Sequence, residues 1–135
     1  MIKRALNLDM KQLAWLAGLL EGEAYFGQHP TSKQTTAPVV ELNSVDHDVI
    51  SRVHRLYAAR YGIAVNIHIR PPRHAGYQPQ YHLACFGAAA RAIMADIAPL
   101  MGARRRARIE ELAGAYVQPQ LLGESRACYD LRGPA

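Results

Sequence analysis

The chain has 135 residues, which is enough for one domain with a real hydrophobic core and leaves little room for a second. Half of the residues are hydrophobic, which excludes a disordered chain, and no apolar run reaches the roughly 18 to 20 residues of a membrane span. Because 16 Lys and Arg outweigh 11 Asp and Glu, the formal net charge is +5 and a nucleic acid is a candidate partner.

Arginine supplies most of the positive charge, and its side chain suits bidentate contacts with phosphate and guanine. Residues 1–4 lead into an acid-containing helix start rather than an apolar secretory core, so a cytoplasmic location is expected. Cys85 and Cys128 are far apart and form no CxxC pair, and the six histidines show no ligand spacing on a helix. The sequence therefore predicts neither a disulfide framework nor a structural zinc site.

The first predicted helix covers residues 10–23, with Asn7 or Asp9 as its cap. Its apolar part, residues 13–20, carries almost no polar side chain, so we expect both sides of the helix to be buried. The rest of the chain is predicted to be organised around this helix and the strand that follows it.

Three small residues, Ala14, Gly18 and Gly22, recur at every fourth position and therefore lie along one face of this helix. Interior glycines each cost roughly 1 kcal/mol relative to alanine, so close contact with another backbone is the expected reason for them. An ordinary buried helix with a glycine-rich end is the alternative. Glu21 and Glu23 favour a functional interpretation, because two carboxylates stand where the helix ends.

Four strands and three more helices are predicted after the first helix. Alternation of apolar and polar residues places the strands at residues 25–29, 38–44, 65–70 and 80–86. Helical spacing places helices at residues 48–61 and 88–98, and a last helix follows the basic segment 102–108 and continues to about residue 116. Ser44 or Asp46 caps the second helix, and Gly62 ends it. Residues 1–117 then form a single domain, and residues 118–135 form a C-terminal tail rich in Pro and Gly.

This order of elements, with its short hairpins, predicts an α+β fold in which a four-stranded antiparallel sheet carries helices on one face. The second strand is expected to point Val39, Glu41 and Asn43 away from the helices, and Val40 and Leu42 toward them. Amides, imidazoles and arginine dominate the outer face, and these groups suit base edges. A solvated face without a ligand is the alternative. The outer-face residues are Tyr25, His29, Glu41, Asn43, Asn66, His68, Arg70, Gln80 and His82, with Lys33 and Arg73 in the flanking loops.

Residues 16–24, which read LAGLLEGEA, resemble the nine-residue signature of the LAGLIDADG homing endonucleases. Residues 25 and 26 follow as the family's first strand does, residues 43–50 look like its strand end and second helix, and residues 102–108 look like its basic segment. Together these matches cover about residues 9–117 in the family's order. The resemblance implies an αββαββα fold with a saddle-shaped antiparallel sheet, in agreement with the order of elements predicted from the residues.

A chain with one signature resembles the homodimeric members of this family, in which two signature helices pack against each other. The resemblance therefore implies a dimer interface along the small-residue side of the first helix. Two-fold symmetry would bring the Glu23 carboxylates of the two copies together. The implied interface residues are Ala14, Ala17, Gly18, Glu21 and Gly22.

The resemblance also implies an activity, the site-specific cleavage of both strands of DNA with Mg²⁺ or Mn²⁺. Phosphodiester hydrolysis needs a metal that stabilises charge and activates water, and Mg²⁺ prefers carboxylate oxygens. By alignment with the signature, Glu23 is the metal-binding acid. Asp46 falls near the hydrolytic water, and Arg104 falls where many members carry a charge-stabilising lysine. The outer face, which also includes Gly27, is implied to lie in the major groove, with phosphate contacts from Lys33, Arg104, Arg105 and Arg106.

Two residues depart from the family pattern. Ala24 replaces the final glycine of the signature, and Arg104 keeps the charge of the usual lysine but not its shape, so either change is expected to slow cleavage. A non-cleaving DNA- or RNA-binding relative, such as an intron maturase or a regulator, is the first alternative. A basic protein-interaction module is the second, and it would leave Glu21, Glu23 and the polar face unexplained.

Overall fold

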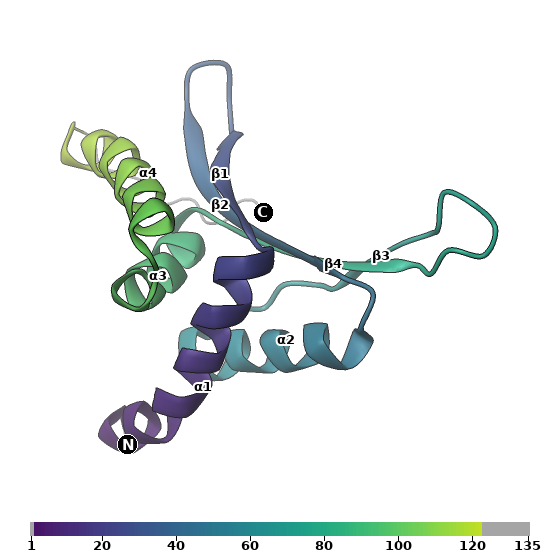
Figure 1. Ribbon diagram of the computed structural model, residues 1–135. Coiled ribbons are helices and arrows are strands. Elements are labelled where there is room, and N and C mark those ends of the chain that lie inside the picture. The colour runs from purple at the N-terminus through teal and green to yellow at the C-terminus, as the bar shows by residue number, and fades with distance from the viewer. Residues whose placement is uncertain (1, 123–135) are drawn as a thin grey trace.

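The computed structural model describes the backbone of residues 2–122 and the side chains of residues 10–113. Figure 1 shows the order of its elements, which confirms the predicted α+β fold class. The elements are α1 (Ile2–Glu23), β1 (Tyr25–Pro30), β2 (Thr36–Ser44), α2 (His47–Tyr61), β3 (His68–Arg70), β4 (Gln80–Phe86), α3 (Gly87–Ile97), the short 3-10 helix η1 (Ala98–Leu100) and α4 (Ala103–Leu122).

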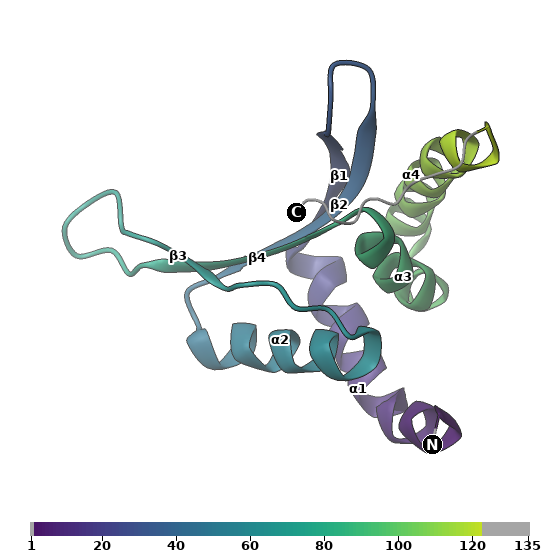
Figure 2. The same ribbon diagram turned by 180° about the vertical axis from the view of Figure 1, so that it is seen from behind.

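The four strands form one sheet in the order β1-β2-β4-β3, and every neighbouring pair is antiparallel. Two hairpin-like arms, β1–β2 and β3–β4, project from the body in different directions (Figure 1). The view from behind shows the same arrangement, with the helices gathered on one side of the bent sheet (Figure 2). One face of the sheet is therefore covered by helices, and we call the other face the open face.

The hydrophobic core lies between the covered face and the helices. Strand residues that point toward the helices, such as Val40, Leu42 and Leu83, are each 1% exposed. Burying an aliphatic side chain of this size contributes about 1.5–3 kcal/mol, so this layer holds the sheet to the helices. The helices supply Leu13, Leu16 and Leu20 from α1, Ile50, Val53 and Tyr57 from α2, Ile93 and Ile97 from α3, and Ile109 and Leu112 from α4.

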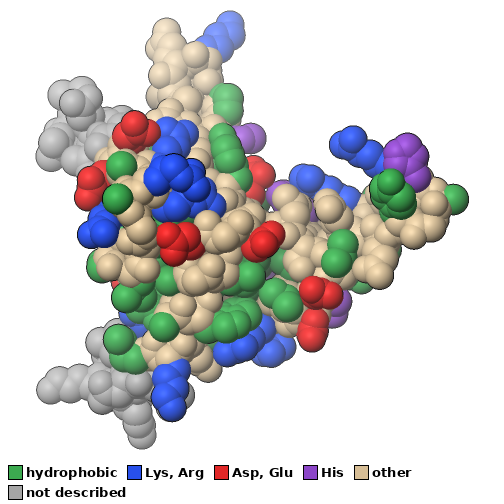
Figure 3. Space-filling view, in the orientation of Figure 1, with side chains coloured by type: hydrophobic (Ala, Val, Ile, Leu, Met, Phe, Trp, Pro, Cys, Tyr) green, Lys and Arg blue, Asp and Glu red, His purple; other side chains and the backbone are tan. Residues whose placement is uncertain are grey.

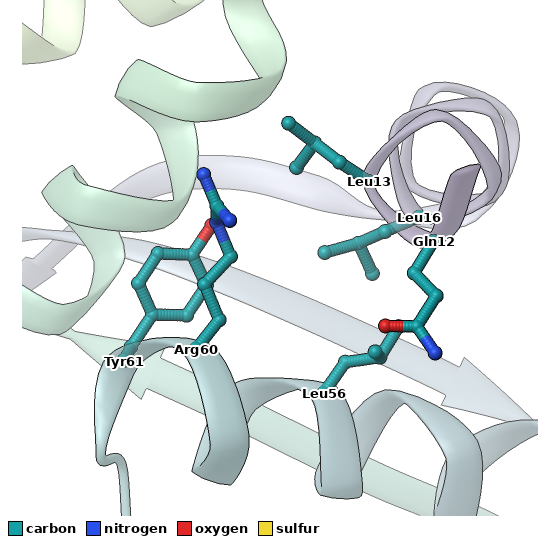
Figure 4. Close-up of a pocket in the computed structure, with 6 residues that line it drawn as sticks. All are labelled: Gln12, Leu13, Leu16, Leu56, Arg60 and Tyr61. Carbon is teal, nitrogen blue, oxygen red and sulfur yellow. The ribbon is translucent and has the colours of Figure 1, made fainter. Parts of the chain in front are cut away.

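Polar side chains join α2 to α3 at the rim of this core. The Asp96 carboxylate on α3 accepts a hydrogen bond from Arg60 Nε at 2.8 Å and another from the Tyr61 hydroxyl at 2.7 Å. Burial and this carboxylate raise the pKa of Tyr61. Figure 4 shows Arg60 and Tyr61 beside a small pocket between α1 and α2. Leucines from both helices form half of its lining, and the pocket is part of the packing between them.

The helices differ from the predicted ones mainly at their ends. The first helix begins at Ile2, so Asn7 and Asp9 lie inside it and do not cap it, because most of residues 2–8 are good helix formers. Gly62 ends α2 as predicted, with a φ of 66°. The last helix continues to Leu122, past the predicted end near residue 116, and the tail residues 123–135 lie outside the described part. None of the helices within residues 2–122 is both long enough and apolar enough to span a membrane.

The third strand is shorter than predicted and contains only His68–Arg70. It pairs with three residues of β4, and the segment before it is irregular. His54 on α2 contacts the Val65 carbonyl oxygen at 2.7 Å, and Val65 is partly buried against the core. The apolar alternation of this segment therefore reflects packing under α2 rather than strand pairing.

Candidate nucleic-acid interface

Strand register decides which predicted outer-face residues lie together. Tyr25 stands opposite Glu41 across β1 and β2, and Asn43 stands opposite His82, which in turn stands opposite His68. Residues in register on neighbouring strands point to the same side of a sheet. The open face therefore carries Tyr25, His29, Glu41, Asn43, His68, Arg70, Gln80 and His82.

Three other predicted contact residues lie off the sheet face. Asn66 precedes β3 and is exposed in the irregular segment, so the prediction that it belongs to the strand face is wrong. Lys33 lies in the β1–β2 loop, where Thr31 and Thr35 bond to each other through their hydroxyls at 2.7 Å. Arg73 lies in the β3–β4 loop. Figure 3 shows basic side chains on both projecting arms, where they could reach a nucleic-acid backbone beside the open face.

Polar atoms without partners lie in the middle of the open face. Within the described part of the chain, Asn43 Oδ1 and His82 Nε2 are buried and have no hydrogen-bond partner. Glu41 Oε1 is 3.7 Å from His82 Nε2, which is too long for a hydrogen bond. Burial and the charge of Arg70 lower the pKa of His82, and Glu41 opposes that shift. Such atoms are rare in folded proteins, and at an open surface they are compatible with a site that an outside molecule completes.

The other half of the open face is aromatic. The Tyr25 side chain lies over Gly27, so that a Cβ at residue 27 would collide with it. The rings of His29 and Phe86 are 4.9 Å apart. Val39 is on this face as predicted, yet it is only 1% exposed, because it lies between Gly27 and Phe86 in the register. Sequence reasoning missed Phe86, although it continues the alternation of Gln80, His82 and Ala84.

The predicted metal-binding acid stands at the junction of α1 and β1. Glu23 is the last residue of α1, and only Ala24 separates it from Tyr25 at the start of β1. The Glu23 side chain is exposed and makes no hydrogen bond or ion pair with the residues that the structure describes. A carboxylate of this kind can ligate a hard cation that keeps several of its waters. Within the described residues, no three His, Cys, Asp or Glu side chains gather closely enough to hold a metal by themselves.

Asp46 and Arg104 also present free charged groups. Asp46 occupies the N-cap position of α2, as predicted, but its carboxylate makes no capping hydrogen bond in the described part of the chain. Its backbone N–H donates to Ser44 Oγ at 3.0 Å. Arg104 is exposed in the first turn of α4 and makes no hydrogen bond or ion pair with the described side chains of residues 10–113. Both side chains are therefore available to an external ligand.

Arg105 is predicted to contact phosphate, and the structure shows that its Nε and Nη2 groups donate hydrogen bonds inside the chain. Its Nε donates to the Glu21 carbonyl at 3.0 Å, and its Nη2 donates to the Leu20 carbonyl at 3.2 Å and to the Ala24 carbonyl. The Glu21 carbonyl lies in the last turn of α1, where helical donors run out, while the Leu20 carbonyl also accepts the Ala24 N–H at 3.0 Å and the Ala24 carbonyl lies just past the helix. Burial lowers the pKa of Arg105. Its neighbour Arg106 remains exposed, with one hydrogen bond to the Met101 carbonyl at 3.2 Å.

Only one side of α1 is buried by the chain itself, in contrast to the prediction for both sides. Ala14, Gly18 and Gly22 are exposed, and a Cβ at either glycine would meet no described atom within 4 Å. Ala17 is 2% exposed and packs into the core of its own chain, so it does not belong to this surface. Glu21 is partly buried, and its carboxylate accepts a hydrogen bond from the Gly102 N–H at 2.7 Å.

Comparison with known proteins agrees with this arrangement. A family profile described as the LAGLIDADG-like domain matches residues 10–96, which is more than half of the chain. The match contains the signature at the end of α1, all four strands and most of α3. A search of curated proteins finds no match. The chain therefore belongs to the LAGLIDADG-like family, the family of homing endonucleases and maturases, whose members bind DNA.

Proposed function

We propose that this protein is a site-specific DNA endonuclease that acts as a homodimer and uses Mg²⁺ or Mn²⁺. One observation carries the proposal: Glu23 offers an exposed carboxylate without a partner among the described residues, at the junction from which the open face begins. We assign the activity to the single domain predicted for residues 1–117. We expect the protein to act in the cytoplasm, where genomic DNA is the substrate.

The open face supports double-stranded DNA as that substrate. Its amide, imidazole and guanidinium groups can bond base edges in a major groove, which is wide enough for a two-stranded ribbon. Lys33 and Arg73 on the two arms, and Arg104 and Arg106 at the start of α4, can contact phosphates. Each neutralised phosphate releases counterions, so binding should weaken steeply as the salt concentration rises.

The exposed side of α1 supports the homodimer. Ala14, Gly18 and Gly22 form a strip without side-chain bulk, and the described chain offers no neighbour that explains either glycine. A second copy of the same strip would explain both, because small residues allow two helix backbones to approach closely. A two-fold axis along this contact would bring two Glu23 carboxylates together, one from each copy.

The chemistry would draw on three charged groups, Glu23, Asp46 and Arg104, which are exposed and have no partner among the described side chains. A divalent metal would supply charge stabilisation at the scissile phosphate and an activated water. Glu23 would hold it, together with phosphate oxygens of the DNA and the partner's carboxylate. Asp46 would orient water through its carboxylate, which makes no capping hydrogen bond, and Arg104 would stabilise the negative charge that develops on the phosphate.

The test is cleavage of a randomised-target DNA library with Mg²⁺ by wild-type protein, by Glu23→Gln and by Glu110→Gln. Glu110 is exposed on α4 and serves as the matched control. We expect double-strand cuts with the wild type and the control, and binding without cuts with Glu23→Gln. Equal cleavage by Glu23→Gln would contradict the metal assignment. Binding without cleavage by the wild type would favour a maturase or regulator.

A further inference from the structure

We propose that Arg105 is a positioning residue for Glu23, because it holds the end of α1 in the place from which Glu23 acts. The inference rests on the proposed function of Glu23, and it assigns Arg105 a role inside the protein rather than on the DNA. The evidence is the set of bonds that join the end of α1 to the start of α4.

Helix α1 ends without a glycine of positive φ. The last carbonyl groups of a helix lack helical partners, and a glycine with positive φ commonly turns the chain so that these groups are satisfied. Glycines with positive φ in the described chain are Gly62, Gly76 and Gly87, and none of them follows α1 in the sequence. The chain instead passes through one residue, Ala24, directly into β1. Apart from the Ala24 N–H, which donates to the Leu20 carbonyl, donors for the carbonyls at this end come from elsewhere in the fold.

The Arg105 guanidinium supplies those donors from a position more than 80 residues away. It bonds the carbonyl oxygens of Leu20, Glu21 and Ala24, and its Cζ lies 4.7 Å from the centre of the Phe26 ring. A cation at this end also complements the negative end of the helix dipole. A single rigid, planar group thus connects the last turn of α1 with the first residues of β1.

A second bond runs in the opposite direction. Glu21 on α1 accepts a hydrogen bond from the Gly102 N–H at 2.7 Å, just before α4 begins. A Cβ at Gly102 would lie 3.0 Å from Glu21 Oε2, so the approach is close. The backbone of Glu23 lies between Glu21 and Ala24, whose carbonyl oxygens both bind Arg105. The bonds therefore fix the backbone on both sides of Glu23 and leave its carboxylate free.

The substitution Arg105→Lys tests this role, because lysine keeps the charge but cannot bond three carbonyls with one planar fork. Arg55→Lys, on the exposed surface of α2, is the matched control. Each full-length variant is measured on a duplex recovered from the cleavage selection. The measurements are the single-turnover cleavage rate, the Kd for the duplex, and Mn²⁺ binding to the protein–DNA complex by electron paramagnetic resonance.

For Arg105→Lys we expect cleavage to slow about 100-fold, because a displacement of about 1 Å at a catalytic group has that effect. Mn²⁺ affinity should fall about tenfold or more, as it does when groups that orient a metal ligand are lost. The Kd for DNA should stay within about threefold of the wild type, since no proposed DNA contact changes. Wild-type values for cleavage and Mn²⁺ binding would overturn the proposal. A parallel loss of DNA affinity would also overturn it, because Arg105 would then act as a DNA contact.

Hydrogen exchange in DNA-free protein separates this inference from the proposed function. The Ala24 N–H bonds the Leu20 carbonyl at 3.0 Å, so its exchange should accelerate in Arg105→Lys while exchange in α2 is unchanged. Unchanged exchange at Ala24 would overturn the positioning role, even if the wild type neither cuts DNA nor binds Mn²⁺. If Arg105→Lys does not fold, Glu21→Ala is used in its place, and it must show smaller changes of the same sign in cleavage rate, Mn²⁺ affinity and Ala24 exchange. Glu21→Gln, which keeps an acceptor oxygen, must give wild-type values of all three.

Discussion

The same strands form both faces of the sheet, but the two faces differ in how the described chain covers and pairs their side chains. Val40, Leu42 and Leu83 on the covered face are each 1% exposed, and the helices of the same chain close over them. On the open face, Asn43 Oδ1 and His82 Nε2 have no partner in the described chain. The chain therefore completes one face by itself, whereas two polar atoms of the other face have no partner among the described residues.

Helix α1 shows the same contrast around its circumference. Leu16 and Leu20 are buried in the core, whereas Gly18 and Gly22 face open space in the described chain. The helix therefore stabilises its own chain along one side only. The other side meets no neighbour among the described side chains, and a second copy of the chain is the partner that we propose for it.

The largest effect is expected for a truncation on the covered face. Leu42→Ala should lower the free energy of unfolding by about 2–5 kcal/mol, because it leaves a cavity between the sheet and the helices. Asn43→Ala, one residue further along β2, should leave that free energy unchanged or raise it, since it removes an unpartnered polar atom. Urea unfolding of both variants checks this pair. Similar losses of stability would contradict the distinction between the faces.

A smaller effect is expected for DNA binding when the open face is changed. Arg70 is exposed at the edge strand and can bond a base edge or a phosphate. Arg70→Gln should weaken binding to the selected duplex by about 1–3 kcal/mol and relax preference at one base pair. Fluorescence anisotropy with a panel of single-base variants measures both. An unchanged Kd at every position would remove Arg70 from the interface.

A change on the exposed side of α1 should act on association and not on folding. Gly18→Leu adds bulk where the described chain has space, and leucine favours the helix more than glycine does. The chain should stay folded, while the dimer Kd rises at least about tenfold, or about 1.4 kcal/mol. Sedimentation velocity measures it, with Ala59→Leu on exposed α2 as the control. If Gly18→Leu dimerises with the same Kd as the wild type, the interface lies elsewhere.

The smallest effect concerns pH. Because burial and Arg70 lower the pKa of His82 in the folded protein, the unfolded chain binds this proton more readily. The stability contributed by neutral His82 is therefore fully present above the unfolded pKa of about 6.5 and is lost as the pH falls below it. His82→Gln should flatten the stability curve in that acidic range. If the stability curve keeps its slope in this range, a group other than His82 determines the pH dependence of stability.

The outcomes for particular residues show what the sequence could predict. Strand alternation identified most of the open face because side chains in a strand alternate with a period of two. Asn66 was assigned wrongly because packing under α2, rather than strand pairing, determines the pattern before β3. The resemblance implies that Ala17 lies in the interface beside Gly18, but adjacent helix residues point about 100° apart, and this rotation turns Ala17 into the core.

Arg105 could not be assigned from the sequence for a different reason. It lies in a run of arginines, and a basic run before a helix indicates a phosphate contact whichever member is considered. Only the fold brings residue 105 to the carbonyls of residues 20, 21 and 24. Contacts between positions so far apart depend on how α4 packs, and no local pattern encodes them.

The central claim is that the open face binds DNA and that Glu23, at the end of α1, performs the chemistry. It is tested most directly by measuring the Kd and the single-turnover cleavage rate of Glu23→Gln on one selected duplex, beside Arg70→Gln. We predict that Glu23→Gln binds like the wild type and does not cut. Arg70→Gln should bind more weakly and cut at the wild-type rate when saturated. Wild-type cleavage by Glu23→Gln, or equal losses of binding and cleavage in both variants, would contradict the claim.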